Sequence, residues 1–223
     1  MVRRITVLIS GSGSNLQALI DSQIQGKLSG EIIQVISSSE SAYGLQRAAN
    51  ASIPAVTHSL KSYYKGTGKE QKEERQIRRE KFNKDLANLI IYGNVEGRYL
   101  ESYKGPDIIV CAGWMLILSP SILTPLDEAG IKIINLHPAL PGAFEGTHAI
   151  ERAWKAGQNG EILKGGVMIH RVITEVDKGA PLLVKEIDLR RGEPLEAYEA
   201  RVHDIEHMAI VEGTNIALND LDK

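Results

Sequence analysis

Short apolar runs alternate with helical stretches along the chain, and this alternation constrains the possible fold more than any other feature. Apolar runs rich in β-forming residues cover 5–10, 32–37, 55–59, 108–113 and 131–137, and helical patterns cover 16–24 and 45–50. The last two apolar runs lack alternating polar residues, as strands covered on both faces should. Strands that alternate with helices predict an α/β fold with a doubly wound, mostly parallel sheet.

The last third of the chain predicts a different arrangement. A helix is expected over about residues 149–156, and two strands over 166–172 and 182–187 would form an antiparallel C-terminal extension. A closing helix begins near Leu195 and carries apolar residues at helical spacing. Between the two regions, the charged segment 69–85 has the pattern of an amphipathic helix with one solvated face.

Length and charge limit the class of protein. A chain of 223 residues with 43% hydrophobic composition can bury a full core, and no internal repeat or long linker divides it. We therefore expect a single domain over residues 1–223, with one half over about 1–105 and the other over about 106–223. The formal net charge of −2 offers no general surface for polyanions, so nucleic acid is not an expected partner.

The compartment is predicted from the single cysteine and the apolar runs. Cys111 lies inside an apolar run and can form no disulfide within the chain, which is typical of a buried thiol in a reducing compartment. The apolar stretch over residues 5–9 ends at Gly and Ser residues and indicates a first strand rather than a signal peptide. No run approaches the roughly 18 apolar residues that cross a bilayer. We expect a cytoplasmic protein without a membrane partner.

A Gly/Ser-rich turn at residues 10–15 follows the first expected strand and opens the first helix. Free N–H groups and the helix dipole at such a place favour an anion, so the turn predicts a phosphate site. The alternative is a capping box without any ligand, since Ser14 and Gln17 match its spacing. Leu16 replaces the third glycine of a dinucleotide-binding motif, and no P-loop lysine follows, so both of those sites are disfavoured.

Three further features could carry chemistry. Asn135 and His137 end an expected strand, whose period of two sends both side chains to the same side, at the sheet edge where open α/β folds bind ligands. Asp177 lies in a polar turn between the late strands, and alone it predicts only a surface turn. The apolar run 114–118 would form either a loop suited to a flat heteroaromatic ligand or part of the core.

Together these motifs resemble the glycinamide ribonucleotide formyltransferase family over nearly the entire chain. The resemblance lies in residues 8–17, 112–115, 135–138 and 201–207, and in the His-x6-Asp spacing from His170 to Asp177. The charged segment and residues 139–142 are similar to those of the fungal branch of this family, in which the formyltransferase is a separate polypeptide.

The resemblance implies a Rossmann-like formyltransferase fold and transfer of a formyl group from 10-formyltetrahydrofolate to the amine of glycinamide ribonucleotide in de novo purine biosynthesis. It places the ribotide in the first half of the chain and folate binding and catalysis in the second. The residues implied for the ribotide are Gly13, Ser14, Asn15, Glu206 and His203, those for folate are Met115, Leu116, Ile117, Leu118, Asn135 and Arg79, and those for catalysis are Asn135, His137 and Asp177. Leu116 stands where bacterial members commonly have Arg, and Met168 replaces a common small polar residue.

The implied mechanism agrees with these residue types. The substrate amine is itself the nucleophile, so neither a Ser or Cys nucleophile nor a metal is required. Asn135 would donate its amide N–H to the formyl oxygen as that oxygen becomes anionic. His137 would be the general acid toward the departing folate nitrogen, and Asp177 would stabilise the imidazolium.

Three alternatives compete with this interpretation. Methionyl-tRNA formyltransferase shares the catalytic trio but normally carries an additional C-terminal RNA-binding domain, which this chain is not expected to contain. A zinc peptidase is suggested by His203, Glu206 and His207 in the H-x-x-E-H pattern, but no third ligand motif follows. A non-catalytic nucleotide-binding module would have no use for the trio. We therefore expect two small-molecule substrates, no nucleic acid and no metal.

Overall fold

The computed structural model describes residues 2–221. Two compact units divide them: the first contains the residues up to 13 together with 30–132, and the second contains residues 14–29 and those from 133 onward. The expectation of one domain with halves that meet near residue 105 stays a prediction.

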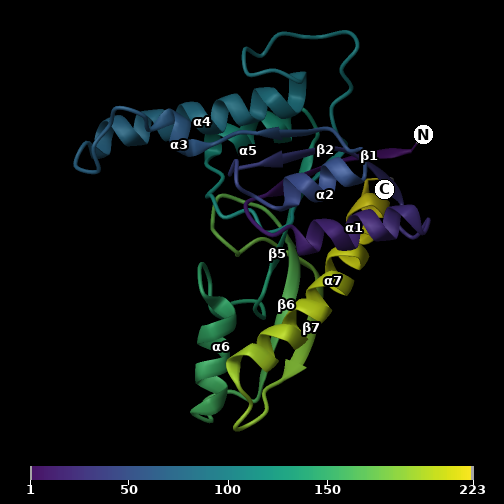
Figure 1. The fold of residues 1–223 in the computed structure, drawn as a ribbon, viewed down its shortest axis with the longest axis vertical. Helices are drawn as coiled ribbons and strands as arrows, with labels where there is room; N and C mark the ends of the chain where they lie inside the picture. Colours follow the sequence, from purple (N-terminus) through teal and green to yellow (C-terminus); the bar gives the residue numbers. More distant parts are fainter. Residues whose placement is uncertain (1, 222–223) are drawn as a thin grey trace. The chain divides into compact units, whose positions relative to one another are not determined.

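The first unit is built on a parallel sheet. Its strands are β1 (Arg3–Ile9), β2 (Gly30–Ser37), β3 (Ala55–Thr57) and β4 (Ile108–Cys111). They are paired in the order β3-β2-β1-β4, and every pair is parallel (Figure 1). All four residues of β4 are buried, as their continuous apolar run predicts. Burial also raises the pKa of the Cys111 thiol to about 12, which keeps it protonated.

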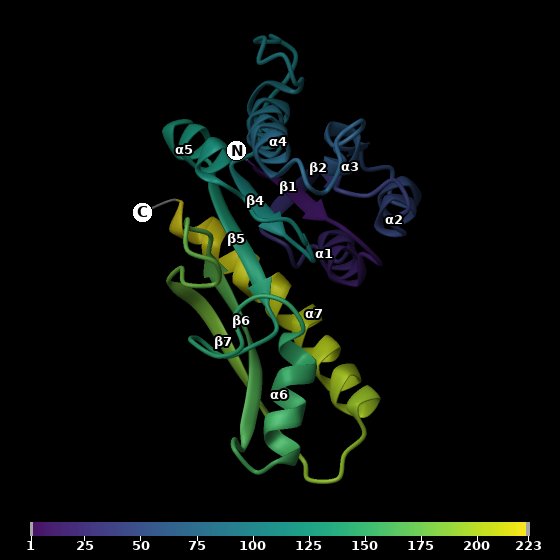
Figure 2. The ribbon, with the colours of Figure 1, turned by 90° about the vertical axis from the view of Figure 1, so that its left-hand side faces the viewer.

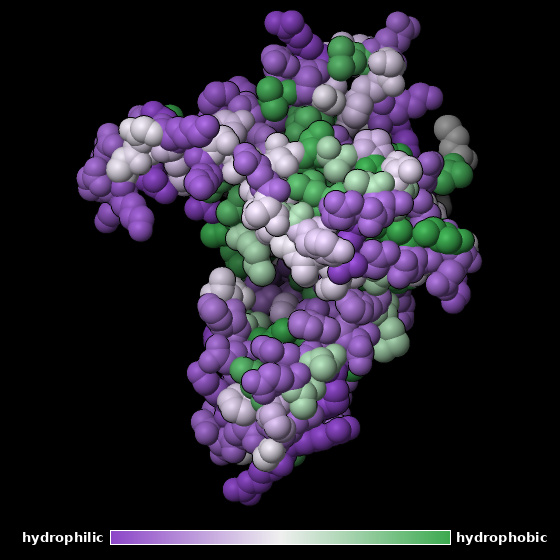
Figure 3. Space-filling model, viewed as in Figure 1, coloured by the Kyte–Doolittle hydropathy of each residue, from purple (hydrophilic) through white to green (hydrophobic). Residues whose placement is uncertain are grey.

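Four helices belong to the first unit: α2 (Gly44–Asn50), α3 (Leu60–Tyr63), α4 (Lys72–Tyr92) and α5 (Pro120–Glu128). The amphipathic pattern predicted α4, which buries Phe82, Leu86 and Ile90 on one face. Its opposite face and the neighbouring α3 are mostly hydrophilic (Figure 3). Gly93 ends α4 with φ of 78°, a left-handed conformation that glycine adopts without a steric penalty.

The second unit contains α1 (Ser14–Ile24), most of β5 (Lys132–His137), α6 (Ala149–Gln158), β6 (Lys164–Arg171), β7 (Pro181–Asp188) and α7 (Leu195–Asp220). Both strand pairs, β5 with β6 and β6 with β7, are antiparallel (Figure 2). Helix α7 packs on α1, β6 and β7. Its approach to β6 requires glycine at position 213, because a Cβ there would lie 2.5 Å from a side-chain atom of Ile169.

The predicted fold class is confirmed: an α/β fold with a mostly parallel sheet and an antiparallel part on the C-terminal side. Within residues 2–221, no helix combines the length and apolarity that crossing a bilayer would require.

Candidate active site

Asn135 and His137 stand at the end of β5 and project to the same side, as the strand period predicts. Antiparallel pairing with β6 places His170 opposite Asn135. The amide nitrogen of Asn135 donates to Nε2 of His170 at 3.2 Å, and His170 is almost completely buried. His170 is the member of this cluster that the sequence interpretation did not assign to the site. The only signal for it was its fixed spacing from Asp177.

Asp177 lies in the loop between β6 and β7 and is not the surface turn residue that its local sequence indicates. Its side chain is 8% exposed, and one carboxylate oxygen accepts a hydrogen bond from the backbone N–H of Gly146 at 2.9 Å. The backbone of Asp177 is left-handed, with φ of 56°, a conformation that Asp tolerates better than most residues. Two residues later, a Cβ at Gly179 would lie 1.6 Å from the carbonyl oxygen of Arg171, so the loop returns to β6 only with glycine there.

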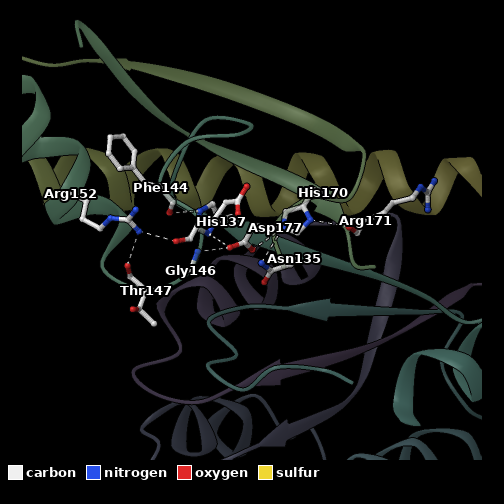
Figure 4. A network of polar contacts seen from close by, with 10 residues as sticks. Asn135, His137, Phe144, Gly146, Thr147, Arg152, His170, Arg171 and Asp177 are labelled. Atoms are coloured by element: carbon white, nitrogen blue, oxygen red, sulfur yellow. Dashed lines mark hydrogen bonds and ion pairs between the residues drawn. The ribbon is translucent and has the colours of Figure 1, made fainter. Parts of the chain in front are cut away.

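The structure brings Asn135, His137 and Asp177 into one polar network (Figure 4). The Asp177 carboxylate lies between two imidazoles: Nδ1 of His137 is 3.3 Å from one oxygen, and Nε2 of His170 is 3.5 Å from the other. Asn135 joins the network through His170. Residues that are 42 positions apart in the sequence, from 135 to 177, therefore meet through two neighbouring strands and one loop.

Both ring nitrogens of His137 face hydrogen-bond acceptors. Nε2 is 3.2 Å from the carbonyl oxygen of Phe144, whose backbone is left-handed with φ of 50°, and Nδ1 faces Asp177. An imidazolium would donate to both acceptors. Burial nevertheless lowers the pKa of His137 below its usual value, while the Asp177 charge and the Phe144 carbonyl oppose this shift. Burial thus favours the neutral ring, while the Asp177 carboxylate and the Phe144 carbonyl can accept the two N–H groups of the protonated ring.

The pKa of Asp177 is lowered. Burial alone would raise the pKa of this carboxyl, but the contact with His170, the hydrogen bond from the Gly146 N–H and the nearby imidazole of His137 together outweigh it. The network therefore contains an amide donor, a titratable imidazole and a fixed negative charge. This set can stabilise an oxyanion and move a proton in acyl transfer.

A second polar pair in the same unit joins α1 to α7. Asn15 and Glu206 are both more than nine-tenths buried. Burial raises the pKa of Glu206, and the His203 charge and a hydrogen bond from Asn15 counter it only in part. The side-chain oxygen of Asn15 is buried without a hydrogen-bond partner in the structure. A carboxyl group and an unpaired amide oxygen together suit a ligand that donates N–H groups.

The Gly/Ser-rich turn is held closely against α2 in the first unit. Gly44 donates its N–H to the carbonyl of Gly11 at 3.1 Å, and Nε of Arg47 donates to that of Ser12 at 2.9 Å. Gly13 has φ of 70°, and a Cβ there would lie 2.6 Å from the Cα of Gly44. A side chain is thereby excluded at Gly13. Ser14 and Asn15 follow it as the first residues of α1.

Except for Asn135 on β5, the residues expected for folate lie in the first unit. The sequence left open whether the run 114–118 forms a loop or part of the core, and the structure shows a loop. Met115 is 77% exposed and Ile117 is 55% exposed, whereas Trp114 and Leu118 at its ends are buried. Leu116 is half-buried. Arg79 is half-buried on α4. His203 is exposed on α7, and the described residues contain no group of three or more His, Cys, Asp or Glu side chains that could hold a metal ion.

Comparison with known proteins identifies similar sequences and structures. Residues 3–214 match the family model described as formyl transferase. The chain is 52% identical to phosphoribosylglycinamide formyltransferase of Saccharomyces cerevisiae and 46% identical to the protein of that name from Schizosaccharomyces pombe, and each match covers 99% of both chains. Its structure is similar to that of glycinamide ribonucleotide transformylase 1 from Symbiobacterium toebii, with a TM-score of 0.77, 29% identity and coverage of 98% and 89% of the two chains.

Proposed function

Since the chain belongs to the formyl transferase family, we propose that it transfers the formyl group of 10-formyltetrahydrofolate to the amine of glycinamide ribonucleotide in de novo purine biosynthesis. The observation that carries the proposal is the buried network of Asn135, His137 and Asp177, because it supplies every group that this acyl transfer requires of a protein. The names of the similar proteins favour the ribotide as acceptor over an aminoacyl-tRNA. Nothing in the network favours a peptidase or a non-catalytic module.

Asn135 stabilises the oxyanion. When the amine attacks, the formyl oxygen gains negative charge, and an oriented N–H donor lowers the barrier. The Asn135 amide has two N–H groups, and its contact with His170 uses one of them. The second is available to the formyl oxygen, and the contact with His170 fixes its direction.

His137 manages the proton. Asp177 faces Nδ1, so Nε2 is the nitrogen that can exchange its contact with the Phe144 carbonyl for the departing folate nitrogen. In the imidazolium form, the proton on Nε2 passes to that nitrogen as the carbon–nitrogen bond of the donor breaks, and the proton that the attacking amine loses replaces it on the ring. The Asp177 charge favours the protonated ring and opposes the effect of burial.

Binding of the two substrates is assigned to different residues. Glu206 and the unpaired oxygen of Asn15 hold the ribotide amine, since both accept N–H donors, and His203 stands one turn before Glu206. The assignment of the phosphate to the start of α1 rests on the helix dipole and on the N–H groups that the first turn of a helix presents to an anion. The residues assigned to the phosphate are Gly13, Ser14 and Asn15, and those assigned to 10-formyltetrahydrofolate are Met115, Leu116, Ile117, Leu118, Asn135 and Arg79. Both substrates are small molecules, and we place the reaction in the cytoplasm.

The test mixes the protein with 10-formyltetrahydrofolate and glycinamide ribonucleotide and follows folate absorbance. Asn135→Ala and His137→Ala should each lower kcat by roughly two to four orders of magnitude, the usual effect of removing an oxyanion donor or a general acid. Methionyl-tRNA serves as the competing acceptor in a parallel reaction. Preference for the tRNA, or near-normal turnover by His137→Ala, would contradict the proposal.

A further inference from the structure

The loop between β4 and α5 exposes apolar side chains at Met115 and Ile117, and both of its ends are held by polar contacts within the first unit. At the first end, the backbone N–H of Met115 donates to Oγ of Ser10 at 2.9 Å. The same oxygen accepts a hydrogen bond from Oγ of Ser38 at 2.7 Å. Ser10 directly follows β1 and Ser38 directly follows β2, and β1 lies between β2 and β4 in the sheet, so the ends of three adjacent strands are linked at this point.

At the second end, one carboxylate oxygen of Glu80 on α4 accepts two hydrogen bonds. Oγ of Ser119, the residue before α5, donates at 2.8 Å, and Oγ of Ser121 in the first turn of α5 donates to the same oxygen. The Glu80 charge therefore lies at the N-terminus of α5, where the helix dipole favours an anion. A charged acceptor with two hydroxyl donors forms stronger hydrogen bonds than a neutral one.

Glu80 also connects the loop to the helix that carries Arg79. The two residues are consecutive on α4, and Leu118, the last residue of the apolar loop, directly precedes Ser119. A shift of α5 relative to α4 would thus move the loop relative to the backbone that carries Arg79. Hydrogen bonds from Ser119 and Ser121 to Glu80 oppose this shift.

We infer that Glu80 is a positioning residue for the formyl donor: it fixes the loop 115–118 and α5 against α4, so that the exposed apolar side chains and Arg79 present one arranged surface to the folate. The inference rests on the proposed function, because it needs the folate to bind on this loop. Glu80 acts through Ser119 and Ser121 and does not itself contact the reacting groups.

The experiment compares Glu80→Gln, Glu80→Ala and the double variant Ser119→Ala/Ser121→Ala with the wild type. We expect the KM for 10-formyltetrahydrofolate to rise roughly ten- to hundredfold in Glu80→Ala and in the double Ser variant, the range for losing a hydrogen bond to a charged group. The rise should be smaller in Glu80→Gln, because its amide oxygen can still accept. The KM for the ribotide should stay within about twofold, because the hydrogen bonds removed are those to Ser119 and Ser121, which are not among the residues assigned to the ribotide. Glu73→Gln is the matched control, since it removes an exposed carboxylate from the same helix.

A second measurement reports on the loop directly and does not depend on catalysis. Trp114 is buried and directly precedes the loop, so its fluorescence in a Trp154→Phe background reports loop order. Quenching by acrylamide should increase in Glu80→Ala and not in Glu73→Gln. Adding the two Ser substitutions to Glu80→Ala should raise the folate KM no further, since all three residues act through one contact.

The outcomes separate the two proposals. A wild-type protein that does not transfer the formyl group contradicts the proposed function. An active wild type with an unchanged folate KM and unchanged Trp114 quenching in Glu80→Gln contradicts the positioning role alone. Equal rises in both KM values would also overturn the inference, because they indicate general damage. Should Glu80→Ala fail to fold, Glu80→Gln and the double Ser variant decide the result.

Discussion

Asp177 combines a charge with an unusual backbone conformation, and two substitutions separate these properties. Its carboxylate lies between His137 and His170, and its φ is 56°. Asparagine keeps the side-chain shape, can still accept the Gly146 N–H and tolerates the left-handed conformation, but it carries no charge. Alanine loses both the charge and the tolerance. Asp177→Asn therefore isolates the electrostatic effect.

The magnitude follows from the distance. Unit charges 3.3 Å apart, as for His137 and Asp177, attract by roughly 5 kcal/mol at an effective dielectric constant of about 20. Desolvation of both groups offsets part of this attraction. We expect turnover to fall by about 10²- to 10⁴-fold in Asp177→Asn, which corresponds to roughly 3–5 kcal/mol of transition-state stabilisation. Asp177→Ala should lose similar turnover and be less stable than Asp177→Asn by about 1–2 kcal/mol.

The dependence of stability on pH gives the prediction a sign. The pKa of Asp177 is lowered in the folded protein, so its stabilising effect is fully present above the unfolded pKa of about 4 and is lost as the pH falls through the folded pKa. The stability difference between wild type and Asp177→Asn should therefore shrink below about pH 4. His137, whose pKa burial lowers, favours unfolding as the pH falls below about 6.5.

The assay uses initial rates from folate absorbance at saturating concentrations of both substrates, and urea unfolding at neutral and acidic pH. In Asp177→Asn, the kinetic pKa assigned to His137 should move down, because the carboxylate charge raises it in the wild type. Turnover above about a tenth of wild type in Asp177→Asn would refute the electrostatic role. Equal stability of the Asn and Ala variants would refute the argument from the backbone.

Three further substitutions or treatments test the remaining assignments. Gly11→Asp should raise the ribotide KM at least tenfold, because it places a negative charge beside the expected phosphate site. The folate KM should stay nearly unchanged, since a Cβ at Gly11 meets no atom within 4 Å and the fold can accept the side chain. A similar rise in both KM values would oppose a phosphate site there. Glu206→Gln should raise the ribotide KM with little loss of Tm, since burial already favours the neutral carboxyl; an unchanged KM would assign Glu206 a structural role. Activity should survive excess EDTA, and stoichiometric zinc in mass spectrometry would instead support the site suggested by His203 and His207.

Much of the fold was predictable because the sequence of each strand or helix carries the pattern that its own burial requires. Parallel strands covered on both faces require continuous apolar runs, and those runs appear in the sequence as β1, β2 and β4. The closing helix was predicted to begin near Leu195, where α7 begins. The apolar run after β4 was ambiguous, because an apolar sequence alone does not distinguish a strand from a loop. Its strand ends at Cys111, and Gly113 then takes φ of 82°, which turns the chain out of the sheet.

The relative position of two site residues was predictable only where both lie on the same strand. Asn135 and His137 share a strand face, which the period of two fixes from the sequence. The burial of Asp177 depends on how the loop after β6 returns past Arg171, and this close approach has no local signature except Gly179. His170 became part of the site through the register between β5 and β6. Strand register is a tertiary property, so the sequence of β6 alone could not reveal the partner of His170.

The network also suggests why one carboxylate serves two imidazoles. Nδ1 of His170 is 2.9 Å from the carbonyl oxygen of Arg171, so this nitrogen carries a hydrogen, and in the neutral ring Nε2 accepts from Asn135. The nearby His170 imidazole lowers the pKa of His137, whereas the Asp177 charge raises it. The two imidazoles therefore have different tasks: His170 directs the Asn135 amide through a hydrogen bond, and His137 is the ring whose protonated form the Asp177 charge favours.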